Sequence, residues 1–161
     1  MVVRDAVSGD ARSIAFIHHQ SVEAADCTMA AALTVQEVLE QLQSPKDREA
    51  WLVLLVSQAV VGWGVVKAYS PRPGYRLACE TSIFLERSLL GKGHGRALQQ
   101  ALLDRSQNLG YHHVVAKIWS ANQGSIRFHQ SFGFELVGIQ REIGFVAGKW
   151  RDVALMQLIH R

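Results

Sequence analysis

The sequence predicts an α/β fold with a mixed central sheet and helices on both of its faces. Short apolar runs of strand length alternate with longer segments whose apolar residues recur at helical spacing. A predicted hairpin precedes a strand–helix–strand–helix–strand series, an order typical of mixed sheets covered by helices. The chain has 161 residues, 48% of them hydrophobic, which suits one domain with a sizeable core. We therefore expect a single domain over residues 1–161.

Seven strands and four helices are expected, and the sequence marks where several of them begin or end. The expected strands are residues 2–6, 51–56, 60–69, 77–86, 113–119, 134–140 and 153–159, and the expected helices are about 11–24, 35–43, 93–108 and 125–132. Ser8-Gly9-Asp10 can cap the first helix, and a capping box of Thr34 and Glu37 begins the second. Asn108-Leu109-Gly110 ends the third helix and Gly133 the fourth.

Two features of these elements call for a structural reason. Gly62 and Gly64 lie inside an expected strand, where glycine weakens pairing unless a bulge or close packing requires it. His18 and His19 are adjacent on the first helix and therefore point about 100° apart. We interpret these histidines as surface or groove residues, and we expect no metal site.

The most informative stretch is a glycine-rich loop, Leu90 to Leu98, which follows a strand and opens a helix. Glycine lets a backbone approach a ligand closely, and the first turn of a helix offers unpaired N–H groups and the positive end of its dipole. Lys92 and Arg96 add positive charge. The loop therefore predicts a cradle for a phosphorylated ligand, although a loop that only turns the chain stays an alternative. It matches neither GxxxxGK[ST] nor G-x-G-x-x-G, since Arg96 stands where the latter needs glycine.

Composition narrows the classes of partner. The formal net charge is +3 and no long Lys/Arg tract occurs, so we expect a small polyanion as ligand and no nucleic acid. No apolar run approaches the ~20 residues of a membrane span, and we expect no membrane partner. Cys27 and Cys79 match no zinc or redox spacing, which favours buried reduced thiols in a cytoplasmic protein.

The order of motifs in the second half of the chain resembles the GNAT superfamily of acyl-CoA-dependent N-acyltransferases. Gly91-Lys92-Gly93-His94-Gly95 is similar to its pyrophosphate loop, with Leu90 where the family usually has Gln or Arg. Three further segments resemble phosphinothricin and methionine sulfone acetyltransferases: Ala78 to Leu85, Asn122 to Phe134 and Gly144 to Val153. The resemblance spans nearly the whole chain and implies a GNAT fold with acetyl-CoA as donor.

The resemblance also implies roles for individual residues. Glu80, expected at the strand end beside the glycine loop, is implied as general base. His129 is implied as a second catalytic residue, as acid or orienter, with a structural role equally open. The implied acetyl-CoA residues are Ile83, Phe84, Leu85, Gly91, Lys92, Gly93, His94, Gly95, Arg96, Asn122 and Ser131. The expected acceptor residues are Arg72, Tyr75, Arg76, Glu80, Thr81 and Ser82. Arg72 or Arg76, which flank the loop before Glu80, could hold an acceptor carboxylate, and a role as solvated loop charges stays equally open.

We therefore expect acetyl transfer to the α-amine of a small amino-acid-like acceptor of the phosphinothricin or methionine sulfone/sulfoximine type, by a homodimer. Residues 24–34 carry Cys27, Thr28 and Met29 where the family often places an aromatic that shapes the acceptor pocket. A polyamine, an aminoglycoside or a peptide N-terminus stays open as acceptor, as does an acyl-CoA-binding module without turnover. Tryptophans could line the pocket or pack in the core: Trp63, Trp119 and Trp150.

Overall fold

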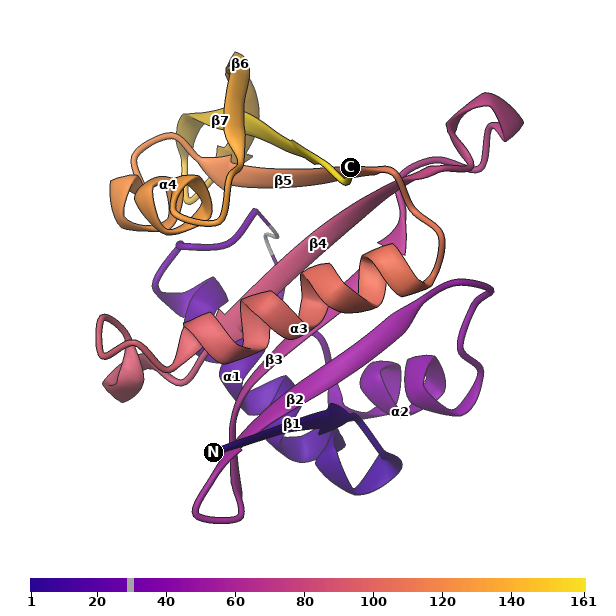
Figure 1. Ribbon diagram of the computed structural model, residues 1–161. Coiled ribbons are helices and arrows are strands. Elements are labelled where there is room, and N and C mark those ends of the chain that lie inside the picture. Colours follow the sequence, from indigo (N-terminus) through magenta and orange to yellow (C-terminus); the bar gives the residue numbers. More distant parts are fainter. Residues whose placement is uncertain (29–30) are drawn as a thin grey trace.

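One seven-stranded mixed sheet organises the protein in a computed structural model that describes residues 1–28 and 31–161 (Figure 1). Its strands are β1 (Val2–Asp5), β2 (Ala50–Val56), β3 (Ala59–Ala68), β4 (Ala78–Leu85), β5 (His113–Trp119), β6 (Glu135–Val146) and β7 (Lys149–Ile159). They lie in the order β1-β2-β3-β4-β5-β7-β6. All neighbouring pairs are antiparallel except β4 and β5, which are parallel.

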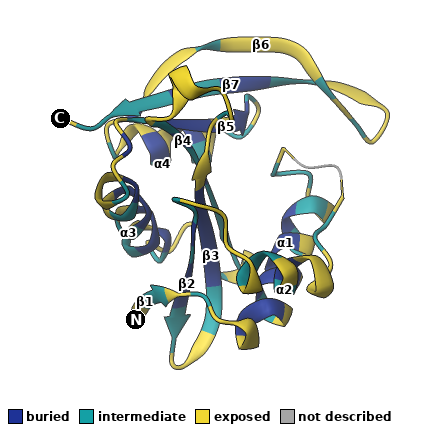
Figure 2. Ribbon diagram, turned by 90° about the vertical axis from the view of Figure 1, so that its right-hand side faces the viewer, coloured by how far each residue is buried: buried dark blue, intermediate teal, exposed yellow. Residues whose placement is uncertain are grey.

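Helices cover both faces of this sheet, as the sequence predicts (Figure 2). They are α1 (Ala11–Glu23), α2 (Val35–Gln43), α3 (Gly95–Asn108) and α4 (Gln123–Gln130). One core lies between the sheet and α3 and includes Leu54, Leu98, Leu102, Val114 and Met156. A second core lies between the sheet and α1 with α2 and includes Ile14, Ile17, Val38, Val53 and Trp63. Burial of these two apolar faces supplies the main stabilisation of the fold.

Close packing explains the two glycines inside β3. A Cβ atom on Gly64 would lie 2.5 Å from Leu102 Cδ1, and one on Gly62 would lie 2.7 Å from Leu85 Cδ2. The absence of a side chain at Gly64 lets α3 sit directly on the sheet, and its absence at Gly62 leaves room for Leu85 at the end of β4. This brings the N-terminus of α3 to the end of β4.

The strands β4 and β5 separate soon after they begin to pair. Their ladder consists of Ala78–His113, Cys79–Val114 and Glu80–Val115, and beyond Glu80 the two strands diverge (Figure 1). The first half of β4 therefore holds the sheet together, while its second half has an unpaired edge toward β5. Glu80 is the last residue of the paired part.

The C-terminal hairpin is longer than predicted. The sequence suggested strands 134–140 and 153–159 with a connecting segment, but β6 and β7 extend to a turn at Ala147 and Gly148. Both turn residues have positive φ, 53° and 76°, which suits a two-residue hairpin turn. The ladder is irregular between Gln140 and Gly144, where the N–H of Glu142 donates to Asp152 Oδ1 at 2.7 Å. Because β6 is mostly exposed and its ladder is interrupted, its residues do not alternate between apolar and polar, and the sequence pattern did not predict its second half.

His18 is fully buried, so its interpretation as a surface or groove residue is wrong. Its Nδ1 accepts a hydrogen bond from the N–H of Leu33 at 2.9 Å, and its ring meets Trp63 and Phe84 edge-on. Burial lowers the pKa of His18 below 6.5. Among the described residues, no helix is long and apolar enough to cross a membrane.

Candidate active site

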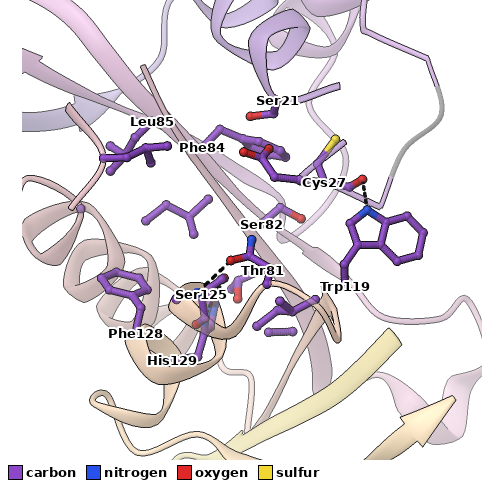
Figure 3. A pocket seen from close by; sticks show the side chains of 18 of the residues that line it. Ser21, Cys27, Thr81, Ser82, Phe84, Leu85, Trp119, Ser125, Phe128 and His129 are labelled. Carbon is purple, nitrogen blue, oxygen red and sulfur yellow. Dashed lines mark hydrogen bonds between the residues drawn. The ribbon is translucent and has the colours of Figure 1, made fainter. Parts of the chain in front are cut away.

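A cavity of about 680 Å³ occupies the space between the diverging strands β4 and β5 (Figure 3). Its walls come from the C-terminal part of α1, residues 26–28, β4, the glycine loop, β5 and α4. The predicted acetyl-CoA residues that line it are Ile83, Phe84, Leu85, Gly91, Gly93, Gly95, Arg96 and Asn122. The cavity thus extends from the glycine loop to the apex where the two strands part.

At one end of this cavity the glycine loop has open space over its backbone. Gly91 and Gly93 have φ of +73° and +84°, and apart from their chain neighbours no atom of the described residues lies within 4 Å of either Cβ position. Glycine is therefore favoured here by the backbone conformation and not by packing. α3 begins directly afterwards at Gly95, so its unpaired N–H groups face the same end of the cavity. These features fit an anionic group such as the pyrophosphate of acetyl-CoA.

The backbone of β4 offers further hydrogen-bonding groups. The N–H of Glu86 donates to the carbonyl of Val61 on β3. Because strand residues alternate between their two neighbours, Phe84 directs its backbone groups to β3, whereas Ile83 and Leu85 direct theirs to the gap. The gap-facing amides are the ones available to a ligand. Phe84 contributes its side chain to the cavity wall instead.

His129 of α4 reaches the cavity as a neutral imidazole. It is 4% exposed, and its Nδ1 lies 2.8 Å from the carbonyl oxygen of Ser125. Because a carbonyl only accepts, the proton must lie on Nδ1 and the lone pair on Nε2. Burial lowers the pKa of His129, while the hydrogen bond to Ser125 opposes this shift. At neutral pH Nε2 is therefore free to accept a hydrogen bond, and the ring is poorly suited to act as an acid.

Glu80 lies at the apex of the divergence, not beside the glycine loop as the sequence suggested. The remainder of β4 separates it from that loop, and its carboxylate Oε1 lies 3.0 Å from Lys117 Nζ on β5. The side chains are 17% and 40% exposed, respectively. Lys117 lines the cavity, whereas Glu80 is not among the lining residues. The carboxylate is thus paired with a lysine that itself lines the cavity.

Trp119 forms a fixed wall close to this ion pair. Its indole Nε1 donates to the carbonyl of Cys27 at 2.6 Å (Figure 3). A Cβ on Gly144 would lie 2.6 Å from its ring, so glycine is needed there for the indole to fit. Trp63, by contrast, is buried in the core and Trp150 is exposed on β7. Of the three tryptophans singled out in the sequence, Trp119 lines the cavity.

The remaining predicted residues are distributed unevenly. Thr81 and Ser82 line the cavity, and the buried Oγ1 of Thr81 has no hydrogen-bond partner among residues 1–28 and 31–161. Lys92 and His94 belong to the glycine loop and Ser131 follows α4, but none of the three lines the cavity. Three predicted acceptor residues are exposed on the turn around Pro73–Tyr75, away from it: Arg72, Tyr75 and Arg76. Met29, noted for the acceptor pocket, lies outside the described residues.

Several lining residues were not predicted, among them Lys117, Ser125 and Phe128. Lys117 could have been noticed, because it interrupts an otherwise apolar strand. Cys79 is buried, and burial raises its pKa to about 12, so this thiol is protonated. Cys27 is half-buried at the cavity wall.

The chain is similar in sequence to known acetyltransferases. A family model described as an acetyltransferase (GNAT) domain matches residues 3–155. An L-amino acid N-acyltransferase of Escherichia coli is 32% identical over 152 residues, which cover 83% of this chain and 88% of the relative. An L-methionine sulfoximine/L-methionine sulfone acetyltransferase of Pseudomonas aeruginosa is 36% identical over 116 residues, covering 70% of this chain and 67% of the relative.

Solved structures show the same architecture. A phosphinothricin acetyltransferase of Sinorhizobium meliloti in complex with acetyl-CoA has a TM-score of 0.91 and 34% identity, over 98% of this chain and 87% of its own. A ribosomal-protein-alanine N-acetyltransferase of Brucella melitensis has a TM-score of 0.94 and 26% identity, over 99% and 100% of the two chains.

Proposed function

The chain belongs to the acetyltransferase (GNAT) family and is an N-acetyltransferase that uses acetyl-CoA; from this premise we propose that its acceptor is the α-amine of a small amino-acid-like molecule. One observation carries the proposal. A single cavity is lined by the glycine loop, which fits a pyrophosphate, by Lys117, whose ammonium pairs with the Glu80 carboxylate at the apex, and by the neutral imidazole of His129.

The donor end of the cavity binds and orients acetyl-CoA, which supplies the acetyl thioester. Backbone N–H groups of Gly91, Gly93 and the first turn of α3 would hold the pyrophosphate, with Arg96 adding charge. Backbone groups of Ile83 and Leu85 would pair with amides farther along the donor. The predicted contacts of Lys92, His94 and Ser131 stay predictions.

At the acceptor end, Glu80 is the proposed general base. An α-ammonium must lose a proton before its nitrogen can attack, and the carboxylate of Glu80 can take that proton directly or through a water. Its place at the apex, next to the cavity-lining Thr81 and Lys117, supports this role. The buried hydroxyl of Thr81, which has no hydrogen-bond partner in the described part of the chain, is suited to hydrogen-bond the acceptor.

His129 is proposed to orient the acceptor through Nε2. Its Nδ1 proton is engaged by Ser125, and burial keeps the ring neutral, so the available atom is a hydrogen-bond acceptor. A role as acid toward the departing thiolate would require protonation, which burial opposes. We therefore favour the orienting role over the acidic one.

The relatives named for L-amino acids, methionine sulfone and phosphinothricin support an amino-acid-like acceptor. The structural neighbour named for ribosomal-protein alanine keeps a peptide N-terminus as the second candidate. Free-thiol release from acetyl-CoA, measured with a panel of amino acids, short peptides and polyamines, tests the proposal. We expect turnover with free amino acids to exceed that with peptides, and the reverse order would contradict the proposal.

The homodimer is also proposed. β6 is an edge strand, and it exposes large apolar side chains: Leu136, Val137, Ile139, Ile143 and Phe145. A long apolar edge is a template for pairing with another chain, which favours a second copy there. Light scattering should give twice the chain mass, and Phe145→Glu should lower it; a monomeric wild-type protein would refute the dimer. The cytoplasmic location expected from the sequence stays a prediction.

A further inference from the structure

We propose that Lys117 binds the carboxylate of the acceptor and thereby uncovers Glu80 for the neighbouring α-ammonium. The inference rests on the proposed function, since it requires an acceptor that carries both groups. It assigns the carboxylate to a residue on β5 inside the cavity, and not to Arg72 or Arg76 on the exposed turn.

The position of Lys117 carries the first step. Its side chain leaves β5 on the same sheet face as Glu80, and its Nζ lies 3.0 Å from Glu80 Oε1. The centre of the uncharged Tyr69 ring lies 5.6 Å from the same Nζ. Among the described residues, Glu80 is therefore the charged partner of this ammonium, and no second one is present. Lys117 lines the cavity while Glu80 does not, so a molecule in the cavity meets the ammonium first.

The other two cationic side chains that line the described part of the cavity, Arg87 and Arg96, interact with partners near the glycine loop. Arg87 forms an ion pair with Asp26, close to the start of the glycine loop. Arg96 donates to Ser131 Oγ at 3.0 Å and lies over the ring of Phe132, beside the predicted pyrophosphate site. Among the described lining residues, Lys117 is therefore the cation placed at the apex, where an acceptor would lie.

A ligand can replace the ion pair between Lys117 and Glu80 at low cost. Partly exposed pairs contribute little to stability, so separating the two groups costs little when a ligand replaces each partner. An α-amino acid has its ammonium and its carboxylate on the same carbon, and it can satisfy both groups at once. Trp119, fixed by its hydrogen bond to Cys27, limits the space beside them. An amine without a carboxylate would leave Lys117 on Glu80 and the proposed base covered.

The test compares amino acids with their carboxamides, which keep the α-amine and lose the negative charge. Thiol release is measured for wild-type protein and Lys117→Met with L-methionine sulfone and other L-amino acids, each beside its carboxamide. A charged hydrogen bond corresponds to about 10- to 100-fold in affinity. We therefore expect Lys117→Met to raise KM for the acids by that factor, with KM for the carboxamides unchanged or lower. Lys117→Arg should keep the preference for acids.

Lys67→Met is the matched control. Lys67 lies opposite Glu80 on β3 and is exposed, but it does not line the cavity, so its removal should leave the acid-to-carboxamide ratio unchanged. An equal effect of Lys117→Met on both substrates, or a ratio altered by Arg72→Ala or Arg76→Ala instead, would overturn the inference alone. A wild-type enzyme that acetylates only amines without a carboxylate would overturn the proposed function as well. Unchanged acetyl-CoA binding by Lys117→Met verifies that the variant is folded.

Discussion

Replacing Gly93 by alanine should separate ligand binding from folding at the glycine loop. Gly93 has φ of +84°, and an added methyl group would meet no described residue within 4 Å other than its chain neighbours. The cost to folding is then backbone strain alone, about 1–2 kcal/mol for an L-residue in the left-handed region. For a chain of this length that corresponds to a fall in Tm of roughly 2–8 °C. The methyl group would instead occupy the space over the loop where the pyrophosphate is expected.

Gly148 provides a matched control, because it has φ of +76°, nothing near its Cβ position, and a place in the β6–β7 turn away from the cavity. Gly148→Ala should lower Tm by a similar amount and leave the acetyl-CoA Kd unchanged. Gly93→Ala should raise that Kd by about 10- to 100-fold in calorimetric titration, as expected for losing a hydrogen bond to a charged group. Equal Kd values for the two variants would show that the loop only turns the chain. Lys92→Ala should have a smaller effect, because an exposed, screened charge contributes little.

Three further predictions concern the base, the pH dependence and the packing. Glu80→Gln should lower kcat by about 10²–10⁴-fold at neutral pH with little change in acetyl-CoA Kd, and the deficit should shrink as pH approaches the pKa of the acceptor amine; near-normal kcat across pH would remove the base assignment. Lowering pH from about 7.5 to 5.5 should reduce the free energy of unfolding measured in urea. Burial lowers the pKa of His18 in the folded protein, so over this range the imidazole is protonated in the unfolded chain before it is protonated in the folded one, and protonation favours unfolding. His18→Asn should flatten that slope, and an unchanged slope would contradict its contribution. Gly64→Ala should cost about 1–3 kcal/mol by forcing α3 from the sheet, whereas Gly138→Ala, with nothing near its Cβ position, should leave Tm nearly unchanged.

Features set by neighbouring residues were predictable from the sequence. The capping box of α2 is present, with the N–H of Glu37 donating to Thr34 Oγ1 at 3.1 Å and the N–H of Thr34 donating back to Glu37 Oε1. The helix that follows the glycine loop begins at Gly95, and most strands lie within a residue or two of their predicted bounds. Each of these depends on turn geometry, capping or apolar periodicity, which act over a few residues.

Features set by distant parts of the chain were missed or misplaced. The burial of His18 depends on Leu33 and on the rings of Trp63 and Phe84, although its spacing from Ile14 already placed it on the buried face of α1. The extension of β6 and β7 depends on their pairing, since exposed β6 lacks the alternation that marks a half-buried strand. Long-range pairing can override a weak local pattern.

The apex of the cavity shows why residue roles were harder to predict than residue types. The sequence singled out Glu80 by its strand, but the position of its carboxylate depends on where β4 stops pairing with β5. That end point also decides that Lys117, two residues beyond Val115 on β5, faces the carboxylate across the opening gap. If the acceptor carboxylate takes Lys117, then the same divergence that makes room for acetyl-CoA also controls access to the proposed base. A substitution that extended the β4–β5 ladder past Glu80 should therefore impair donor binding and acceptor selection together.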